Sequence, residues 1–357
     1  MKNNALVLGI ESSCDDTSVA LMQGDQILYH HKYGQEELLK SWGGVVPELA
    51  ARNHLQKMTP LLSDCFSKTQ TSPKQLDLIS VTTTPGLLGA LLTGLNAAKT
   101  LSLLYQIPII ATNHLYAHLE AIHLCQKVSY PYLGLLISGG HSIYFYVKDK
   151  STFKVLGSTI DDAAGEAFDK GGKLLGLGYP AGHVIDRLAK FGEIKKDIFP
   201  IGLKSSADAR LSFSGLKTSL RVFLENNPEI ISQKPKQFET KEDASSEFYN
   251  FCASYQQAIS DALLLKLRYA LKLAKEKYDA PKECAIVVGG GVACNSKIRE
   301  DLKLKYPQAL FVAPQFCTDN GAMIANYGRL NYEKAISFPD CLYLDSRGRF
   351  INKKDFV

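Results

Sequence analysis

Apolar and polar positions alternate along this chain in two similar series of short strands. Each series starts with an apolar run that leads into a polar loop, followed by a second run, a turn and a third run. The first series covers residues 5–11, 18–22 and 26–30, and the second covers residues 132–137, 143–147 and 152–156. Because the same order recurs after about 125 residues, the pattern predicts a duplicated domain.

Helical and strand patterns follow each series. The predicted helices are 86–105, 114–125, 162–175, 181–191, 244–278 and 321–330, and the further strands are 76–81, 107–112, 284–288 and 309–313. This alternation predicts a three-layer α/β fold with two lobes and a central ligand cleft. We expect an N-terminal lobe over 1–130, a C-terminal lobe over 131–335 with a polar, irregular insertion near 201–245, and a C-terminal tail over 336–357.

Composition and charge narrow the class of protein. The 357 residues suffice for about two domains, and 45% hydrophobic with 22% charged residues is typical of a globular chain. The net charge of +5 arises entirely after residue 150. Basic residues gather over 266–277 on the predicted helix 244–278 and again over 297–305, which suits a polyanion such as nucleic acid; a solvated lysine face is the alternative.

Cysteine usage and the apolar pattern bear on location. None of the 8 cysteines forms a C-x-x-C pair, so zinc-finger and thioredoxin spacings are excluded. No apolar stretch of about 20 residues lacks polar interruption, so we expect no membrane span. Scattered cysteines without a leader-like segment favour a reducing, cytoplasmic setting.

Three apolar strands end in small polar loops, at residues 9–16, 138–140 and 289–291. Glycine in such loops lets backbone N–H groups approach a phosphate closely. The patterns G-x-x-x-x-G-K-[ST] and G-x-G-x-x-G are both absent, which disfavours P-loop NTPases and Rossmann dehydrogenases. A single loop of this kind is more often a structural turn. Three of them in a duplicated α/β chain favour an actin-like nucleotide cleft.

His114 and His118 are spaced to lie on one face of a helix and to ligate one metal ion. Leu115 stands where an H-E-x-x-H protease needs its glutamate, so that mechanism has no general base here. A third ligand must come from elsewhere in the chain. Asp319 is a candidate, and an ordinary cap at the start of the predicted helix 321–330 is the alternative interpretation.

The motifs together resemble one family. They are GIESSCD at 9–15, GGVVPE at 43–48, H-x-x-x-H at 114–118, SGGH at 138–141, DDAAGEAFDK at 161–170, FSGLKT at 213–218, GGV-x-x-N at 290–295 and CTDNGAM at 317–323. Their order and residues resemble the universal tRNA N6-adenosine threonylcarbamoyltransferase family, in its bacterial TsaD type. The resemblance covers about the first 335 residues and does not depend on any single motif.

The resemblance implies a fold, a reaction and a set of partners. The fold would be duplicated and actin-like, as in actin, hexokinase and Hsp70. The reaction would transfer a threonylcarbamoyl group from threonylcarbamoyl-AMP to N6 of the adenosine beside the anticodon in tRNAs that read ANN codons. One divalent metal per subunit is implied, usually iron, with zinc also found in the family. A TsaB-like paralogue and a TsaE-like ATPase would be partners.

The resemblance also assigns residues. The metal ligands would be His114, His118 and Asp319. The adenylate would be held by Leu136, Ile137, Ser138, Gly139, Gly140, Asp169, Gly182, Asp186 and Asn295. Glu11, Asp15 or Asp16 could relay a proton, and the sequence does not choose among them.

The chain departs from the family pattern at Tyr116, inside the histidine motif, at His183, beside Gly182, and at Leu39, where the family often has histidine. None of the three departures removes a metal ligand. Two further functions are compatible with the fold: a kinase or ATPase of the actin-like class, and a non-catalytic scaffold subunit. The kinase would need no histidine pair, and the shortened paralogue of the family lacks the metal site.

Overall fold

A computed structural model describes residues 4–35, 42, 44–232, 234–235 and 246–349. The chain forms two compact units. Unit 1 comprises Met1–Tyr130, Asp149–Thr152 and Val312–Val357, and unit 2 comprises Pro131–Lys148 and Phe153–Phe311.

Unit 1 is built on a five-stranded mixed sheet in the order β3-β2-β1-β4-β5. The strands are β1 (Leu6–Glu11), β2 (Thr17–Gln23), β3 (Gln26–Tyr33), β4 (Leu78–Thr84) and β5 (Ile109–Asn113). β2 lies antiparallel to β1 and β3, whereas β1, β4 and β5 run parallel. The predicted hairpin series and the two later strands of this half therefore form one sheet.

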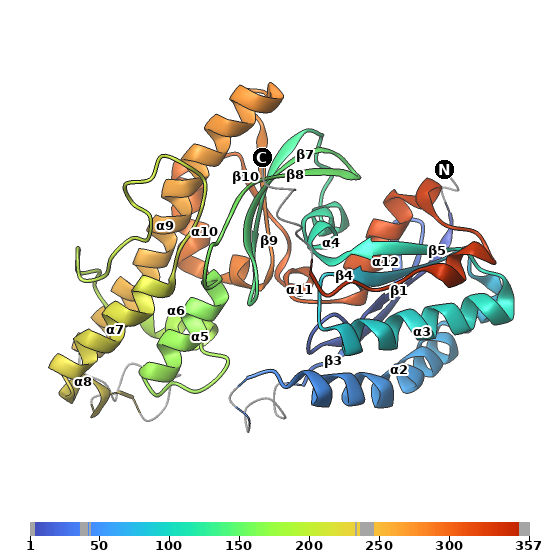
Figure 1. Ribbon diagram of the computed structural model, residues 1–357, viewed down its shortest axis with the longest axis horizontal. Coiled ribbons are helices and arrows are strands. Elements are labelled where there is room, and N and C mark those ends of the chain that lie inside the picture. Colours follow the sequence, from blue (N-terminus) through green and yellow to red (C-terminus); the bar gives the residue numbers. More distant parts are fainter. Residues whose placement is uncertain (1–3, 36–41, 43, 233, 236–245, 350–357) are drawn as a thin grey trace. The chain divides into compact units, whose positions relative to one another are not determined.

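Helices cover both faces of this sheet (Figure 1). They are α2 (Pro47–Thr69), α3 (Leu88–Tyr105), α4 (His114–Glu120), α11 (Pro314–Cys317) and α12 (Gly321–Leu330). α2 and α3 pack against each other and close one core with apolar side chains of β1, β2 and β4. α4 and α12 lie on the other face, where α12 packs on β1, β2 and β4. The segment after residue 311 thus completes unit 1.

Unit 2 repeats the same topology. Its sheet has the order β10-β9-β6-β7-β8, made of β6 (Tyr132–Ile137), β7 (Ser142–Asp149), β8 (Thr152–Ser158), β9 (Ala285–Gly289) and β10 (Ala309–Phe311). β6 is central, antiparallel to β7 and parallel to β9, as β1 is to β2 and β4. The predicted duplication is therefore confirmed at the level of strand order.

The helices of unit 2 are α5 (Ala164–Leu174), α6 (Gly182–Ala189), α7 (Ser214–Asn226), α8 (Glu229–Ser232), α9 (Ser246–Tyr278) and α10 (Ser296–Lys305). α9 packs on α6 and α10. It also meets β7, since the Tyr144 hydroxyl donates to the carbonyl of Leu263 at 2.7 Å and the rings of Tyr146 and Tyr278 stack.

The prediction of an irregular segment over 201–245 is wrong for its central part, which forms α7. Leu216, Leu220 and Leu224 recur every fourth residue and are buried on one face of this helix. Asp161 fixes the start of the helix, because its carboxylate accepts hydrogen bonds from the backbone N–H and the hydroxyl of Ser214. The many polar residues of this segment masked the amphipathic pattern of α7 in the sequence.

None of the helices in the described ranges combines the length and the apolar character that a membrane span requires.

Candidate functional site

The pleat of β1 directs its acidic residue, Glu11, toward α4. Leu6, Leu8 and Ile10 belong to the core under α2 and α3, so Gly9 and Glu11 face the opposite side of the sheet. At Gly9 the backbone of α12 comes so close that a Cβ atom would lie 2.3 Å from a carbonyl oxygen of that helix. The missing side chain lets α12 lie directly on the sheet beside Glu11.

The two histidines enter this face from the end of β5. Asn113 closes the strand and caps α4, because its Oδ1 accepts from the backbone N–H of Leu115 at 2.9 Å and of Tyr116 at 3.3 Å. His114 is the first residue of the helix and His118 follows one turn later. Both are buried, with 7% and 1% of their surface exposed.

Asp319 comes from the loop between α11 and α12. From the sequence, Asp319 could be either a metal ligand or the cap of α12. The cap interpretation is wrong, because Asn320 caps the helix: its Oδ1 accepts from the N–H of Met323 at 2.9 Å. The N–H of Gly321 in turn donates to the hydroxyl of Ser18 at 2.9 Å. The loop is thus tied to β2, and the carboxylate of Asp319 is left to face the histidines.

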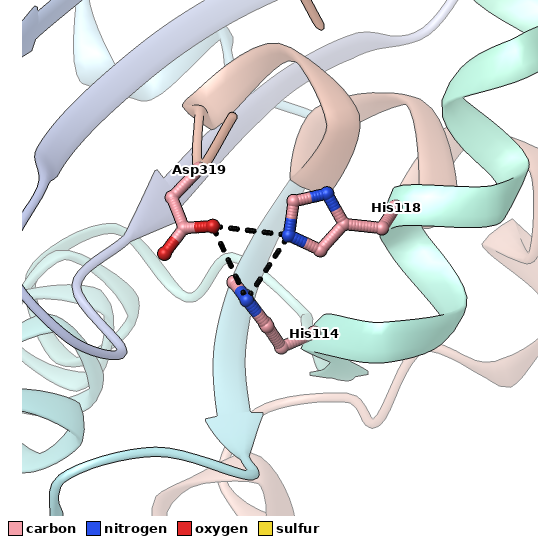
Figure 2. Close-up of side chains that lie close together, drawn as sticks. All are labelled: His114, His118 and Asp319. Carbon is pink, nitrogen blue, oxygen red and sulfur yellow. Dashed lines mark hydrogen bonds and ion pairs between the residues drawn. The ribbon is translucent and has the colours of Figure 1, made fainter. Parts of the chain in front are cut away.

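The three side chains converge on one point (Figure 2). Nε2 of His118 lies 3.2 Å from Nε2 of His114 and 3.0 Å from Oδ1 of Asp319. Nε2 of His114 lies 3.4 Å from the same oxygen. All three residues belong to unit 1, so this cluster does not depend on unit 2.

The spacing of these atoms fits a bound cation. Ligands held about 2.0–2.1 Å from a metal would lie about 2.9–3.4 Å apart for angles between 90° and tetrahedral. The three measured separations fall in this range. Two neutral imidazoles and a carboxylate offer three lone pairs and too few protons to bridge all three contacts, whereas one cation satisfies them together.

Contacts behind the cluster orient one imidazole. Nδ1 of His114 lies 3.0 Å from Oε2 of Glu11 and 3.2 Å from the hydroxyl of Ser13. Glu11 is completely buried, and its carboxylate also accepts from the N–H of Ser13 and the hydroxyl of Thr82, both at 2.6 Å. A carboxylate behind a histidine places the ring proton on Nδ1 and leaves Nε2 to bind a metal. Nδ1 of His118 is buried and has no partner among the described residues.

The charges of the cluster are strongly coupled. Burial by itself lowers the pKa of His114, but the carboxylates of Asp319 and Glu11 raise it well above its usual value. Burial and the neighbouring His114 lower the pKa of His118. Burial alone would raise the pKa of Asp319, and the two imidazoles outweigh it and hold that pKa well below its usual value. The two carboxylates thus favour a positive charge between them.

The other acidic candidates lie beside this cluster. Burial and the charge of Asp319 raise the pKa of Asp15. The same two causes raise the pKa of Asp16 to about 7, although Lys32 opposes them through an ion pair of 2.8 Å. Glu11 differs from both, because its two oxygens are already bonded inside the protein.

In unit 2, the segment predicted to hold an adenylate phosphate is a tight turn at the end of β6. The N–H of Ser138 donates to the carbonyl of His141 at 2.8 Å, and Leu136 and Ile137 are buried in the strand. A Cβ atom at Gly139 or Gly140 would meet nothing within 4 Å, so the turn has open space beside it.

Two other segments lie against this turn. The start of α5 packs on it so closely that a Cβ atom at Gly165 would lie 2.6 Å from the Cα of Gly139. The loop at residues 289–291 contributes Gly290, which has a φ of 90°. A Cβ atom at this position would lie 2.4 Å from the carbonyl oxygen of Ile137, so a side chain is excluded. The structure thus brings two of the three glycine loops together in unit 2.

The remaining predicted nucleotide residues flank these loops. The carboxylate of Asp169, on α5, accepts from the N–H of Ala181 at 2.8 Å, just before Gly182 at the start of α6. Asp186, on α6, accepts from the N–H and the hydroxyl of Ser296, the latter at 2.8 Å. Asn295 caps α10. All of these residues belong to unit 2.

Comparison with known sequences identifies the family. The sequence profile described as "TsaD: tRNA N6-adenosine threonylcarbamoyltransferase" matches residues 26–326. Proteins of that name from Anaeromyxobacter sp. (strain Fw109-5) and Thermotoga neapolitana are 42% and 39% identical to this chain; the alignments cover 90% and 95% of it and 93% and 98% of the relatives. The chain belongs to the tRNA N6-adenosine threonylcarbamoyltransferase family. It is a transferase that acts on tRNA, as the sequence predicted.

Solved structures agree with the fold expected for a member of this family. Full-length HypF has a TM-score of 0.54 at 12% identity, over 93% of this chain and 47% of HypF. Component A of (R)-2-hydroxyglutaryl-CoA dehydratase from Acidaminococcus fermentans has a TM-score of 0.51 at 14% identity, over 92% of this chain and 98% of that protein. The predicted duplicated, actin-like fold is confirmed.

The departures from the family pattern lie in different places. Tyr116 is half-buried on α4, and His183 is exposed at the start of α6. Burial raises the pKa of the nearby Asp169, and the N–H groups of Ala181 and Gly182 oppose this more strongly than His183 does. Leu39 lies outside the described residues.

Four residues that support these sites were not predicted from the sequence, namely Ser13, Thr82, Gln256 and Ser296. Ser13 lies inside the first glycine loop, only two residues after Glu11, so the sequence itself indicates that the two residues are close. Nothing in the sequence marks the other three, because their partners are 39 to 110 residues away.

Proposed function

We propose that the chain transfers the threonylcarbamoyl group of threonylcarbamoyl-AMP to N6 of the adenosine next to the anticodon in tRNAs that read ANN codons. A bond forms between N6 and the carbamoyl carbon, the bond from that carbon to the AMP phosphate breaks, and N6 loses a proton. The convergence of His114, His118 and Asp319 in a member of this family is the observation that carries the proposal. A kinase reaction would have no use for that cluster.

We propose that this cluster holds one divalent metal, iron or zinc. Its donor set of two imidazoles and one carboxylate suits either metal. The buried carboxylate of Glu11 and the half-buried carboxylate of Asp319 carry two negative charges that one divalent cation balances. When bound, the metal would supply Lewis-acid polarisation of the carbamoyl group. The Glu11 carboxylate orients His114 for this purpose.

The chain's own groups would bind the donor and handle the proton. The N–H of Ser138 is used inside the turn, so the backbone N–H groups of Gly139 and Gly140 would hold the phosphate. Asp169, Gly182, Asp186 and Asn295 would contact the ribose and base. An adenine amine is a weak nucleophile, so alignment of donor and acceptor should supply much of the rate. Since the oxygens of Glu11 are occupied, we retain Asp15 and Asp16 for proton transfer.

We propose that tRNA contacts the basic segment 266–305. It contains ten Lys and Arg against five Asp and Glu, a net charge of +5 that equals that of the whole chain. Arg268 and Lys303 are exposed, and they lie over the rings of Tyr269 and Phe311 at 5.0 and 5.8 Å. Cations beside aromatic rings suit phosphates and unstacked bases of an anticodon loop.

The salt dependence of tRNA binding tests this surface. The double variant Arg268→Glu/Lys303→Glu should weaken binding at least tenfold at 150 mM salt and should reduce the slope of log K against log salt by about 1.4–1.8. The matched control is Lys74→Glu/Lys127→Glu, the same charge change at exposed positions of unit 1. Equal losses in both variants would reveal a nonspecific effect of net charge and would reject the surface.

We further propose, by analogy with other members of the family, that a TsaB-like paralogue and a TsaE-like ATPase are partners and that the protein acts in the cytoplasm. If the purified chain modified tRNA alone at the rate of the mixture, the partner requirement would be wrong.

The decisive experiment is threonylcarbamoyl transfer to unmodified tRNA, with threonylcarbamoyl-AMP and both partners supplied. We would compare wild type, His114→Ala and the control His31→Ala, which removes an exposed histidine on β3. Metal content is measured on each protein. Product and metal from wild type and His31→Ala but not from His114→Ala support the proposal. Product from all three rejects the metal's role, and no product from wild type with verified partners rejects the transferase reaction.

A further inference from the structure

The side chain of Asn295 is fixed by two protein contacts. Its Oδ1 accepts from the N–H of Ile298 at 3.0 Å, which caps α10. Its Nδ2 donates to Oε1 of Gln256, on α9, at 2.7 Å. Both side chains are buried, with 8% and 3% of their surface exposed. The oxygen and nitrogen of a side-chain amide can exchange places by a 180° flip. These two contacts fix one orientation, with Oδ1 toward Ile298 and Nδ2 toward Gln256.

The neighbouring residue is held from another helix. Ser296 donates through its N–H and its hydroxyl to the carboxylate of Asp186, on α6. The first turn of α10 is therefore clamped between α9, through Gln256, and α6, through Asp186. The glycine loop that leads into this turn rests on the end of β6 at Gly290. The turn has few ways to shift without breaking a buried hydrogen bond.

We propose that Gln256 is a positioning residue for the donor nucleotide. It acts through Asn295, by holding the amide so that one Nδ2 hydrogen and one Oδ1 lone pair stay available for the adenylate. This inference depends on the proposed function, which assigns Asn295 and Asp186 to that ligand. It adds a residue of α9 that itself does not touch the nucleotide.

The next residue on the same helix provides a matched control. Nε2 of Gln257 donates to Asp261 at 2.9 Å and to Asp301, on α10, at 3.1 Å. Gln257 thus also links α9 to α10. Its side chain leaves α9 about 100° further around the helix than that of Gln256, and it contacts α10 beyond the first turn. Replacing either glutamine by methionine keeps the length of the side chain and removes one hydrogen-bonded link between the same two helices.

The test measures KM and kcat for threonylcarbamoyl-AMP in the transfer assay, the Kd of AMP as a binding probe, and the melting temperature. Gln256→Met should raise KM and Kd about tenfold and leave kcat within about twofold, because only one buried amide contact is lost. Gln256→Glu keeps an acceptor oxygen and should restore KM to within about threefold of wild type. Gln257→Met should lower the melting temperature comparably and leave KM and Kd unchanged.

Several outcomes would overturn the inference. Unchanged KM and Kd in Gln256→Met would remove the role of this residue, and equal losses in Gln256→Met and Gln257→Met would reduce it to packing of α9 on α10. If Gln256→Met does not fold, Gln256→Ala is judged by the same criteria. The two proposals can be rejected separately. If wild-type protein neither binds AMP nor uses threonylcarbamoyl-AMP, the proposed function is rejected. If the wild type is active and Gln256→Met behaves like it, only the positioning role of Gln256 is rejected.

Discussion

Replacement of Glu11 by glutamine should weaken metal binding without any change in the ligands themselves. The N–H of Ser13 needs an acceptor at 2.6 Å, so the amide oxygen of the new side chain must take that place. Its NH₂ group then faces Thr82 and His114. The threonine hydroxyl can rotate to accept, but Nδ1 of His114 can accept only if its proton moves to Nε2. That proton would point at His118 and Asp319, where the metal is expected.

The size of the effect follows from the burial of these groups. Burial by itself raises the pKa of Glu11, but His114 lowers it by more, so this fully buried side chain is a carboxylate. Its hydrogen bonds are therefore those of a charged group and are worth about 1.5–3 kcal/mol when lost. Loss of an outer carboxylate behind a metal-binding histidine typically costs about 10–100-fold in metal affinity. We therefore expect Glu11→Gln to bind zinc at least about tenfold more weakly than wild type and to transfer correspondingly less at limiting metal.

The assay is zinc competition with a chromophoric chelator, combined with thermal melting in chelator alone. Thr82→Val is the matched control, because it removes one hydrogen bond to the same carboxylate and leaves its charge and its contact with His114. This variant should lose about 1 kcal/mol of stability and keep zinc affinity within about threefold. Wild-type zinc affinity in Glu11→Gln would refute the tautomer argument, as would an equal loss in Thr82→Val.

Three further predictions concern the fold around the sites. Gly9→Ala should lower the free energy of unfolding by about 3 kcal/mol or more, because its Cβ atom would lie 2.3 Å from the backbone of α12. The control Gly215→Ala, whose Cβ atom would meet nothing within 4 Å, should not destabilise the protein, and similar melting temperatures for the two variants would contradict this prediction. Asn320→Ala should cost about 1 kcal/mol through the lost cap and also weaken zinc binding by loosening Asp319, and intact zinc affinity would show that other contacts hold the loop. Burial raises the pKa of Asp161, but hydrogen bonds from the start of α7 lower it by more, so its stabilising effect is complete above about pH 4 and is lost as pH falls through the lowered pKa. Asp161→Asn should therefore melt lower than wild type at pH 7 and approach it at acid pH, and a constant difference in a pH series of melts would exclude the carboxylate.

The sequence predicted elements where the information was local. Apolar runs separated by polar turns marked all ten strands of the described chain to within a few residues, since pleated, buried strands need only neighbouring residues to be read. The i, i+4 spacing of His114 and His118 placed both on one face of α4 for the same reason. α7 was missed because its three buried leucines are scattered in a polar segment, and α2 was not predicted because its apolar positions are sparse along 23 residues.

What the sequence determined by itself was the repeated series of strands, the family motifs and the pair of histidines. The tertiary structure decided which distant residues meet them: Asp319 reaches His118 across 201 residues, Glu11 reaches His114 across 103, and Gln256 reaches Asn295 across 39. These contacts depend on strand order and on how closely α12 packs on β1 at Gly9. A single sequence records no such distances, because hydrogen bonds between remote side chains leave no periodic pattern along the chain.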